Sequence, residues 1–167
     1  MTILLDNREP DPHPWIPYLP EGWRVEWGTM ETGDLALARL PDGVVIERKS
    51  PSDFAGCIGS NRERFERELR RSRHLGRFLV IVEGSLADVA TAGRSMHHAA
   101  ILGTVAAWST RYCPIIFAGS VPAAAALAFS ALRSQVRDIQ RQGKAIEGDA
   151  PARGNKESFN DRPKLAV

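Results

Sequence analysis

The chain has 167 residues, of which 43% are hydrophobic and 25% are charged, with a formal net charge of +2 and a mean hydropathy of −0.24. This is the size and composition of one globular domain with a sizeable core. No apolar run approaches the ~18 residues of a membrane span, and charge at Asp6 leaves no room for a signal peptide. Cys57 and Cys113 alone form neither a disulfide framework nor a paired-cysteine zinc site. We therefore expect a soluble, cytoplasmic domain with no membrane partner.

The first fifty residues indicate a sheet. An apolar run at residues 2–5 predicts a buried strand. Five prolines between residues 10 and 22 exclude a long helix and leave room for a short helical turn at 15–19. Pro and Asp-Gly at residues 40–43 favour a hairpin connection. Short apolar or alternating patterns predict three further strands, arranged as a β-meander, at residues 23–27, 34–39 and 44–49.

The remainder of the chain predicts helices that alternate with strands. Ser50 and Pro51 are typical of a helix start, and Gly76 and Gly143 are typical of helix ends. The expected elements are helices at 61–77, 96–112 and 121–141, and strands at 78–84 and 114–118.

This order of elements predicts an α/β domain with a mixed central sheet flanked by helices. We expect the folded domain to span residues 1–142. Residues 143–167 are polar, with almost no apolar pattern, and are expected to form a disordered tail.

Two acids and a lysine are expected to meet at one end of the sheet. Glu47 and Lys49 are one residue apart on a predicted strand, so both point to the same face. Pairing with the preceding strand brings Asp34 to the same end. Paired carboxylates suit a hard cation such as Mg²⁺, and a neighbouring lysine could orient or deprotonate water, or stabilise charge. The cluster has the groups that metal-assisted phosphodiester hydrolysis requires.

Taken alone, Glu-x-Lys on a strand is most often a solvated charge pair, and Asp after Gly is most often part of a turn. The whole string is more specific, because Gly33-Asp34 is followed by Glu47-Arg48-Lys49 and then by Asp53. It resembles the GD…ERKxxxD signature of the XPF/MUS81 (ERCC4-type) nuclease domain, in the PD-(D/E)XK superfamily. Residues 5–9, 64–69 and 78–83 resemble further parts of that pattern. The resemblance implies a restriction-endonuclease-like fold.

The resemblance also implies roles for the central residues. Asp34 and Glu47 would be metal ligands, and Lys49 would be the catalytic lysine. The implied cofactor is Mg²⁺, for which Mn²⁺ is able to substitute.

Four further residues match family positions. Glu9 would add a carboxylate to the same ion, and Asp6 matches an acidic position that is either a ligand or lies behind one. Arg48 and Asp53 match positions that the family needs for activity, with Asp53 orienting its neighbours.

The chain departs from the family pattern in two places. The family's arginine helix usually reads Gly-Arg-Phe with a glutamine three residues after the Phe, whereas here Glu63 precedes Arg64 and Glu68 stands at the glutamine. Many members also carry a tandem helix-hairpin-helix domain, for which residues 142–167 are too short and too polar. The chain therefore resembles a stand-alone nuclease domain of phage or bacterial type, which places it in the cytoplasm of a bacterial or phage-infected cell.

Seven arginines lie between residues 62 and 77. They could belong to a solvated helix with i,i+4 pairs such as Glu63–Arg67 and Glu66–Arg70. Beside a nuclease signature they favour phosphate contacts instead, because the guanidinium group is planar and always charged. The candidate DNA-binding residues are Arg8, Arg62, Arg64, Arg67 and Arg71.

The remaining candidates have simpler interpretations. His97 and His98 are adjacent on a helix and point in different directions, which favours ordinary surface histidines. The four tryptophans could stack on bases, but packing is the better expectation, and both cysteines are expected to be buried thiols. The helices at 96–112 and 121–141 are more apolar than one sheet face needs. In the family the corresponding region mediates dimerisation, so a symmetric homodimer is expected.

These observations favour a Mg²⁺-dependent DNA endonuclease that cuts one strand near a flap, fork or recombination branch, in repair or recombination. Two alternatives stay open: a non-catalytic DNA-binding or dimer-partner subunit, and a PD-(D/E)XK exonuclease that acts on free ends. A non-catalytic subunit would be expected to lack the acid–acid–lysine set, which is intact here.

Overall fold

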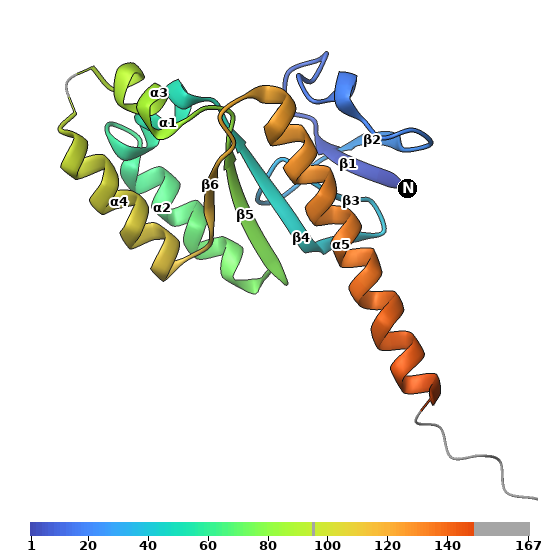
Figure 1. The fold of residues 1–167 in the computed structure, drawn as a ribbon. Coiled ribbons are helices and arrows are strands. Elements are labelled where there is room, and N and C mark those ends of the chain that lie inside the picture. Colours follow the sequence, from blue (N-terminus) through green and yellow to red (C-terminus); the bar gives the residue numbers. More distant parts are fainter. Residues whose placement is uncertain (95, 149–167) are drawn as a thin grey trace, which may run out of the picture.

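The computed structural model describes residues 1–94 and 96–148. A six-stranded sheet runs through the molecule with helices on both faces (Figure 1), which confirms the expected α/β class. The strands are β1 (Thr2–Asp6), β2 (Arg24–Gly28), β3 (Leu35–Leu37), β4 (Leu40–Lys49), β5 (Arg77–Val82) and β6 (Ile115–Phe117).

The order of strands across the sheet is β2-β1-β3-β4-β5-β6. β1 is parallel to β2 and antiparallel to β3, β3 is antiparallel to β4, and β4, β5 and β6 are parallel to one another. The predicted meander over residues 23–49 is therefore wrong, because β1 lies between β2 and β3. Alternation along the chain could not show this, since the N-terminal strand pairs on both of its edges. As a result, β1, β3 and β4 are neighbours at the centre of the sheet.

The connection between β3 and β4 is tighter than expected. Leu37 pairs with Leu40, so residues 40–43, predicted as the hairpin connection, belong to β4. The register of the pair shifts immediately beside this turn. The irregular segment then contacts the start of β5, where the amide of Gly76 donates to the carbonyl of Asp42 at 2.7 Å. Pro and Asp-Gly therefore mark an irregularity within a long strand rather than its beginning.

The helices lie on the two faces of the sheet (Figure 1). One face is covered by α1 to α4, and the other by α5 together with the short 3-10 helix Ile16–Tyr18. Within the described ranges, no helix is both long and apolar enough to cross a membrane. The helix bounds are α1 (Pro51–Ile58), α2 (Arg62–Arg71), α3 (Leu86–Ala92), α4 (His98–Arg111) and α5 (Val121–Gly148), and a second 3-10 helix spans Ser72–His74.

The charged helix is shorter than predicted, and one helix was not predicted. α2 ends at Arg71, where the hydroxyl of Ser72 donates to the carbonyl of Leu69 at 2.9 Å, and Arg77 already belongs to β5. α3 begins with a capping box in which Ser85 and Asp88 bond each other's backbone amides. The spacing of these two residues is a sequence signal for a helix start.

The last helix is longer than predicted. α5 continues to Gly148, so Gly143 does not end it. A single glycine costs a helix interior only about 1 kcal/mol, which is too little to stop a long helix by itself. Residues 149–167, the greater part of the predicted tail, lie outside the described residues.

Two hydrophobic cores meet the two faces of β4. Val45 packs into the core beneath α1 to α4, whereas Ile46 packs into the core beneath α5. The alternation of a strand continues to its end, so Glu47 and Lys49 face the α1–α4 side and Arg48 faces the α5 side. This alternation positions the candidate site.

Candidate active site

Three neighbouring strands bring three acids to one end of the sheet. Side chains alternate between the two faces of a strand, and this alternation puts Asp6, Asp34 and Glu47 on the face of the sheet that packs beneath α1 to α4. The amide of Asp6 donates to the carbonyl of Asp34 at 3.0 Å, and the amide of Asp34 donates to the carbonyl of Ile46 at 2.8 Å. These bonds continue the ladder past the strand ends and hold the backbones of the acids next to one another.

Gly33 determines how Asp34 enters the sheet. Its φ of +83° is a left-handed conformation that favours glycine. A Cβ at this position would lie 2.3 Å from Cγ1 of Val45. Beyond this turn, Oδ2 of Asp34 accepts from the amide of Arg48 at 2.8 Å. The backbone conformation and the close packing at position 33 therefore explain why glycine precedes Asp34 in the motif, since a larger residue there would displace the acid.

Lys49 lies between Glu47 and α2. Its ammonium group donates to Oε1 of Glu47 and, at 3.3 Å, to the carbonyl of Arg48. It also lies 5.6 Å from the ring centroid of Phe65, on the buried side of α2. Glu47 is only 2% exposed, and its second oxygen, Oε2, is buried without a hydrogen-bond partner. The structure thus brings together the two acids and the lysine as the sequence predicts.

Burial dominates the electrostatics of this cluster. It raises the pKa of Asp34 to about 7, against the attraction of Lys49 and helped by the charge of Glu9. Burial, and then the charge of Asp34, also raise the pKa of Glu47 well above its usual range. Burial acts to lower the pKa of Lys49, but the charges of Glu47 and Asp34 outweigh it and raise that pKa.

The donor set fits a divalent cation. Oε2 of Glu47 and Oε2 of Glu9 are both buried, and neither accepts an aligned hydrogen bond, so each keeps a lone pair for a ligand. Within residues 1–94 and 96–148, no three His, Cys, Asp or Glu side chains are grouped closely enough to form a metal site. An ion here would be bound by few carboxylates and completed by water and phosphate oxygens, which is the coordination that Mg²⁺ prefers.

Asp6 is engaged by its own neighbours. Oδ1 accepts from the amide and Nε of Arg8 at 2.8 and 2.6 Å, and Oδ2 accepts from Nη2 of Arg8 at 2.9 Å and the amide of Met30 at 2.7 Å. Burial raises the pKa of Asp6, but these bonds outweigh burial and the pKa is lowered. Of the two roles left open for Asp6, this favours a place behind the ligands. The side chain of Arg8 remains 68% exposed.

Asp53 is exposed at the start of α1. Its amide donates to Oγ of Ser50 at 3.1 Å, and the Ser50 hydroxyl donates to its Oδ2 at 2.6 Å. These contacts join the beginning of α1 to the end of β4. They favour an indirect role for Asp53, in which it helps to fix the backbone that follows Lys49.

Arg48 points away from Asp34 and Glu47, to the α5 side of the sheet. Its Nε lies 3.1 Å from Oε1 of Glu83, and its Nη1 lies 3.5 Å from Oε2 of Glu9. The structure therefore places Arg48 beside Glu9, at the rim of the cluster, rather than between the two central acids.

Three arginines of the charged helix and the residues after it face α4. Arg62 lies 3.1 Å from Glu66, donates to Oγ1 of Thr104 at 3.0 Å and lies over the ring of Trp108 at 5.2 Å. Arg70 lies 3.7 Å from Glu66, and Arg73 lies over the ring of Tyr112 at 5.3 Å. These contacts make Arg62 part of the packing of α2 on α4.

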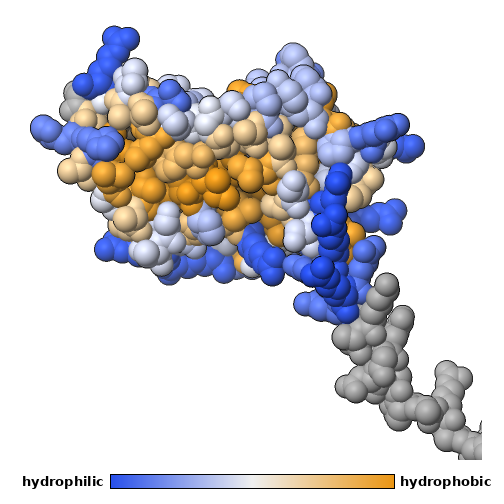
Figure 2. All heavy atoms as spheres, in the orientation of Figure 1, coloured by the Kyte–Doolittle hydropathy of each residue, from blue (hydrophilic) through white to orange (hydrophobic). Residues whose placement is uncertain are grey.

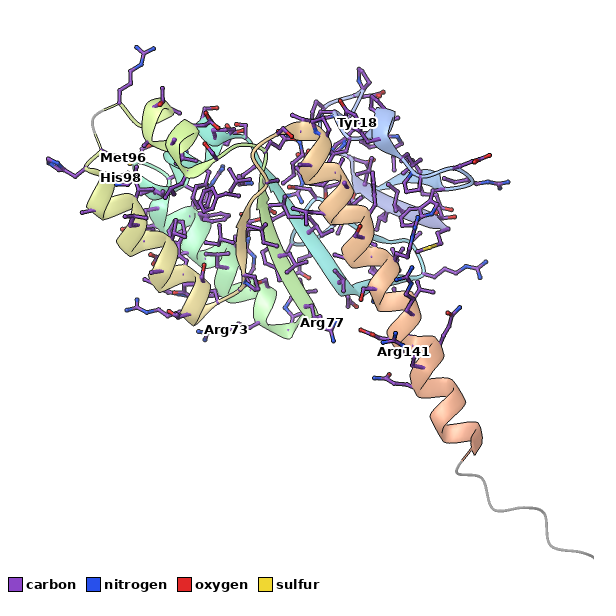
Figure 3. The ribbon with its side chains drawn as sticks, viewed as in Figure 1. Tyr18, Arg73, Arg77, Met96, His98 and Arg141 are labelled. Atoms are coloured by element: carbon purple, nitrogen blue, oxygen red, sulfur yellow. The ribbon has the colours of Figure 1, made fainter. Side chains whose placement is uncertain are left out.

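Three other arginines form a separate stripe. Arg64, Arg67 and Arg71 are exposed, and their spacing of three and four residues aligns them along α2. Figure 3 shows Arg73 and Arg77 at the opposite end of the sheet from the acids, where β5 begins.

Glu68, which departs from the family pattern, is a further candidate for the site. It follows Phe65 by three residues and so lies on the same side of α2. Its charge contributes, after the larger effects of burial and of nearer charges, to the raised pKa values of Asp34 and Glu47. The spacing was visible in the sequence, but the contact between Phe65 and Lys49 was not.

The histidines, the cysteines and two of the four tryptophans behave as predicted, whereas Trp27 is exposed. His97 and His98 are exposed at the start of α4, and His98 points away from the sheet in Figure 3. Trp15 and Trp108 are buried, as are both cysteines.

The fold and the cluster together define a nuclease-type α/β domain: an acid-x-lysine sequence ends a central strand, and a second acid begins the antiparallel strand beside it. A profile of the ERCC4 domain matches residues 5–130, and the chain belongs to this family. DNA nucleases of the family generally depend on a divalent metal.

Two solved structures are similar to this chain. XPF from Aeropyrum pernix has a TM-score of 0.64 at 24% identity, and the same protein in complex with DNA has a TM-score of 0.66 at 22% identity. Each comparison covers 92% of this chain and 76% of the other. A comparison with curated proteins gave no match.

The raised pKa of Asp34 predicts a pH-dependent stability. Between the ordinary pKa of 3.8 and the folded value of about 7, the folded protein holds a proton that the unfolded chain has lost. The free energy of unfolding of the metal-free protein should therefore fall as the pH rises through this window. Asp34→Asn should be more stable than the wild type by about 1–3 kcal/mol at pH 8 and equal to it near pH 4. Urea unfolding in EDTA measures both.

Asp88→Asn is the matched control, because hydrogen bonds from Ser85 lower the pKa of Asp88. This variant should lose stability at neutral pH, the opposite sign. Identical pH profiles for Asp34→Asn and the wild type would contradict the electrostatic description of the site.

Proposed function

We propose that this chain is a metal-dependent DNA endonuclease that hydrolyses phosphodiester bonds in branched, flap or fork DNA during repair or recombination. The observation that carries the proposal is the cluster of buried Glu47, half-buried Asp34 and Lys49 where β3 begins and β4 ends. Membership of the ERCC4 family supports the chemistry. The similar fold of Aeropyrum pernix XPF in complex with DNA supports the class of substrate.

Asp34 and Glu47 would hold Mg²⁺, or Mn²⁺ in its place, with Glu9 adding a third negative charge from the loop after β1. When bound, the ion would draw charge from the phosphate and lower the pKa of water. The raised pKa values of both central acids support this assignment, because two buried carboxylates are costly to ionise together without a compensating cation.

Lys49 supplies positive charge next to the acids. Its raised pKa keeps it an ammonium at neutral pH, which favours stabilising the charge that develops on the phosphate and orienting water over removing a proton. Its bonds to Glu47 and to the carbonyl of Arg48, and the ring of Phe65, hold it in place. The complete set of acids and lysine favours catalysis over a non-catalytic subunit.

Substitution of the central residues should stop cutting. Asp34→Asn, Glu47→Gln and Lys49→Met should each slow hydrolysis at least about 100-fold, because each removes a charge that acts on the phosphate or the ion. Asp88→Asn, which changes only the cap of α3, should cut like the wild type. Labelled flap, fork, four-way-junction and linear duplex DNA, with Mg²⁺, Mn²⁺ or EDTA, provide the measurement.

Cutting that survives EDTA, or an Asp34→Asn variant as active as the wild type, contradicts the mechanism. A wild-type protein that binds these substrates and cuts none of them is instead a DNA-binding subunit. Degradation of linear duplex from its ends, with branched DNA left intact, indicates the exonuclease alternative.

The stripe of Arg64, Arg67 and Arg71 is the surface we propose for the DNA backbone, together with Arg8 beside the acids. The stripe is exposed, and it lies on the helix whose buried side contacts Lys49. Arg62, also a candidate from sequence, is assigned to helix packing because of its contacts with Thr104 and Trp108.

Removal of two guanidinium groups should change the salt dependence of binding. The Arg67→Ala, Arg71→Ala double variant should bind fork DNA more weakly, and its plot of log affinity against log salt should be shallower by about 2, because each lost phosphate contact removes about 0.9 from the slope. Arg70→Ala, on the α4 side of the same helix, should leave the slope unchanged. Fluorescence anisotropy over a salt series measures the slope. Equal slopes for the wild type, the double variant and Arg70→Ala would contradict this DNA surface.

An apolar surface supports a homodimer through the C-terminal helices. Figure 2 shows hydrophobic side chains gathered in a broad band over α4, β6 and α5. Leu102 on α4 and Leu127 on α5 are 45% and 39% exposed. In the described part of the chain β6 pairs only with β5, so its outer backbone edge is open. We propose that a second copy of the chain covers this surface.

A charge in the band should disrupt the dimer. Leu102→Glu should weaken self-association at least about tenfold, because it would bury a carboxylate in an apolar interface. Trp27→Glu is the control, since Trp27 is similarly exposed, at 40%, on β2 at the opposite edge of the sheet. Sedimentation velocity measures both, and a wild-type monomer, or a dimer lost in Trp27→Glu alone, would contradict the proposal.

A further inference from the structure

The loop after β1 buries a histidine beside Glu9. His13 is 1% exposed and packs edge-on against Trp15, with the ring centroids 5.6 Å apart. A buried imidazole needs partners for its nitrogens. The amide of Trp15 donates to Nδ1 of His13 at 3.1 Å. Nδ1 is therefore an acceptor, and the ring proton of neutral His13 is on Nε2.

The nitrogen that carries this proton lies next to Glu9. Nε2 of His13 lies 3.2 Å from Oε2 of Glu9, and Nη1 of Arg48 lies 3.5 Å from the same oxygen. Both contacts are oblique rather than linear, and the oxygen is buried. Two neighbouring groups therefore hold the carboxylate by attraction, while a lone pair of Oε2 is left uncommitted.

Two further side chains close this network into a ring. Oε1 of Glu83 lies 3.1 Å from Nε of Arg48 and accepts from Nε1 of Trp15 at 2.7 Å. Glu83 follows β5 directly and Arg48 belongs to β4, so the ring joins the loop after β1 to the ends of two central strands. The charge of Glu9 acts on Asp34: burial is the main cause of the raised pKa of Asp34, and the charge of Glu9 adds to it.

We propose that His13 is a positioning residue of the active site, which holds Glu9 against Arg48 through the close contact of Nε2 with Oε2, so that the charge of Glu9 stays beside the metal site proposed for Asp34 and Glu47. The inference rests on the proposed function. His13 itself contacts neither the ion nor DNA, and it acts through Glu9. Residues that orient a ligand in this way change metal affinity even though they are not ligands.

Two substitutions by residues with an amide side chain distinguish the role of Nδ1 of His13 from that of Nε2. His13→Asn keeps an acceptor for the Trp15 amide but is too short to reach Glu9, and it should weaken Mn²⁺ binding to the DNA-free protein about tenfold. His13→Gln places an amide N–H near the position of Nε2 and should stay within about threefold of the wild type. Calorimetric titration with Mn²⁺ gives the affinities, after circular dichroism has verified the fold of each variant.

Glu9→Gln is the matched variant, and it should lose as much affinity as His13→Asn does. The double variant should lose no more than either single one, because His13 acts through Glu9. A wild-type Mn²⁺ affinity in His13→Asn, or additive losses of affinity in the double variant, overturns the positioning role of His13 but leaves the proposed metal site standing. A wild-type chain that binds no Mn²⁺ overturns the proposed metal site and this inference with it.

A measurement on the wild type keeps the proposal testable if His13→Asn does not fold. The imidazole ¹⁵N resonances of His13 should report a proton on Nε2. A proton on Nδ1 would overturn the proposal, because Nε2 could then not donate to Glu9.

Discussion

The carboxylates of Asp34 and Glu47 lie close together at the end of β4, in a largely buried site where one ammonium group, that of Lys49, opposes their repulsion. Burial raises the pKa of both acids, so their ionised pair is unfavourable as it stands, and the proposed divalent cation would compensate their charge. Much of the surrounding structure holds this pair together. The turn at Gly33 admits Asp34 to the sheet, and the ring of Phe65 supports Lys49.

The alternation of side chains along β4 divides the machinery between the two faces of the sheet. Glu47 and Lys49 face α2, which also carries the exposed arginine stripe, so the acids and the proposed DNA surface lie on one side. Arg48, one residue away, faces α5 and joins the polar ring that includes Glu9 and His13. A shift of one residue in the register of β4 would exchange these two sets of contacts.

The net charge of +2 is the sum of opposed features. Acids gather at the ends of β1, β3 and β4, while α2 carries a high density of arginine. Some of these arginines have partners within the chain: Arg62 and Arg70 of α2 lie against Glu66, and Arg62 also lies over the ring of Trp108 on α4. Glu66–Arg70 is one of the i,i+4 pairs expected of an ordinary charged helix, so the structural and the DNA-binding interpretations of this helix apply to different sides of it.

The sequence by itself determined the α/β class, most of the elements, and the meeting of Asp34, Glu47 and Lys49, because these follow from short periodicities and from pairing of adjacent strands. It did not determine that β1 separates β2 from β3, or that His13 lies beside Glu9. Only the tertiary structure decided these, since they depend on contacts between distant segments: the bond from Trp15 to Glu83 spans 68 residues, and that from Arg62 to Thr104 spans 42. Local patterns carry no information about which distant partner a buried polar group will meet.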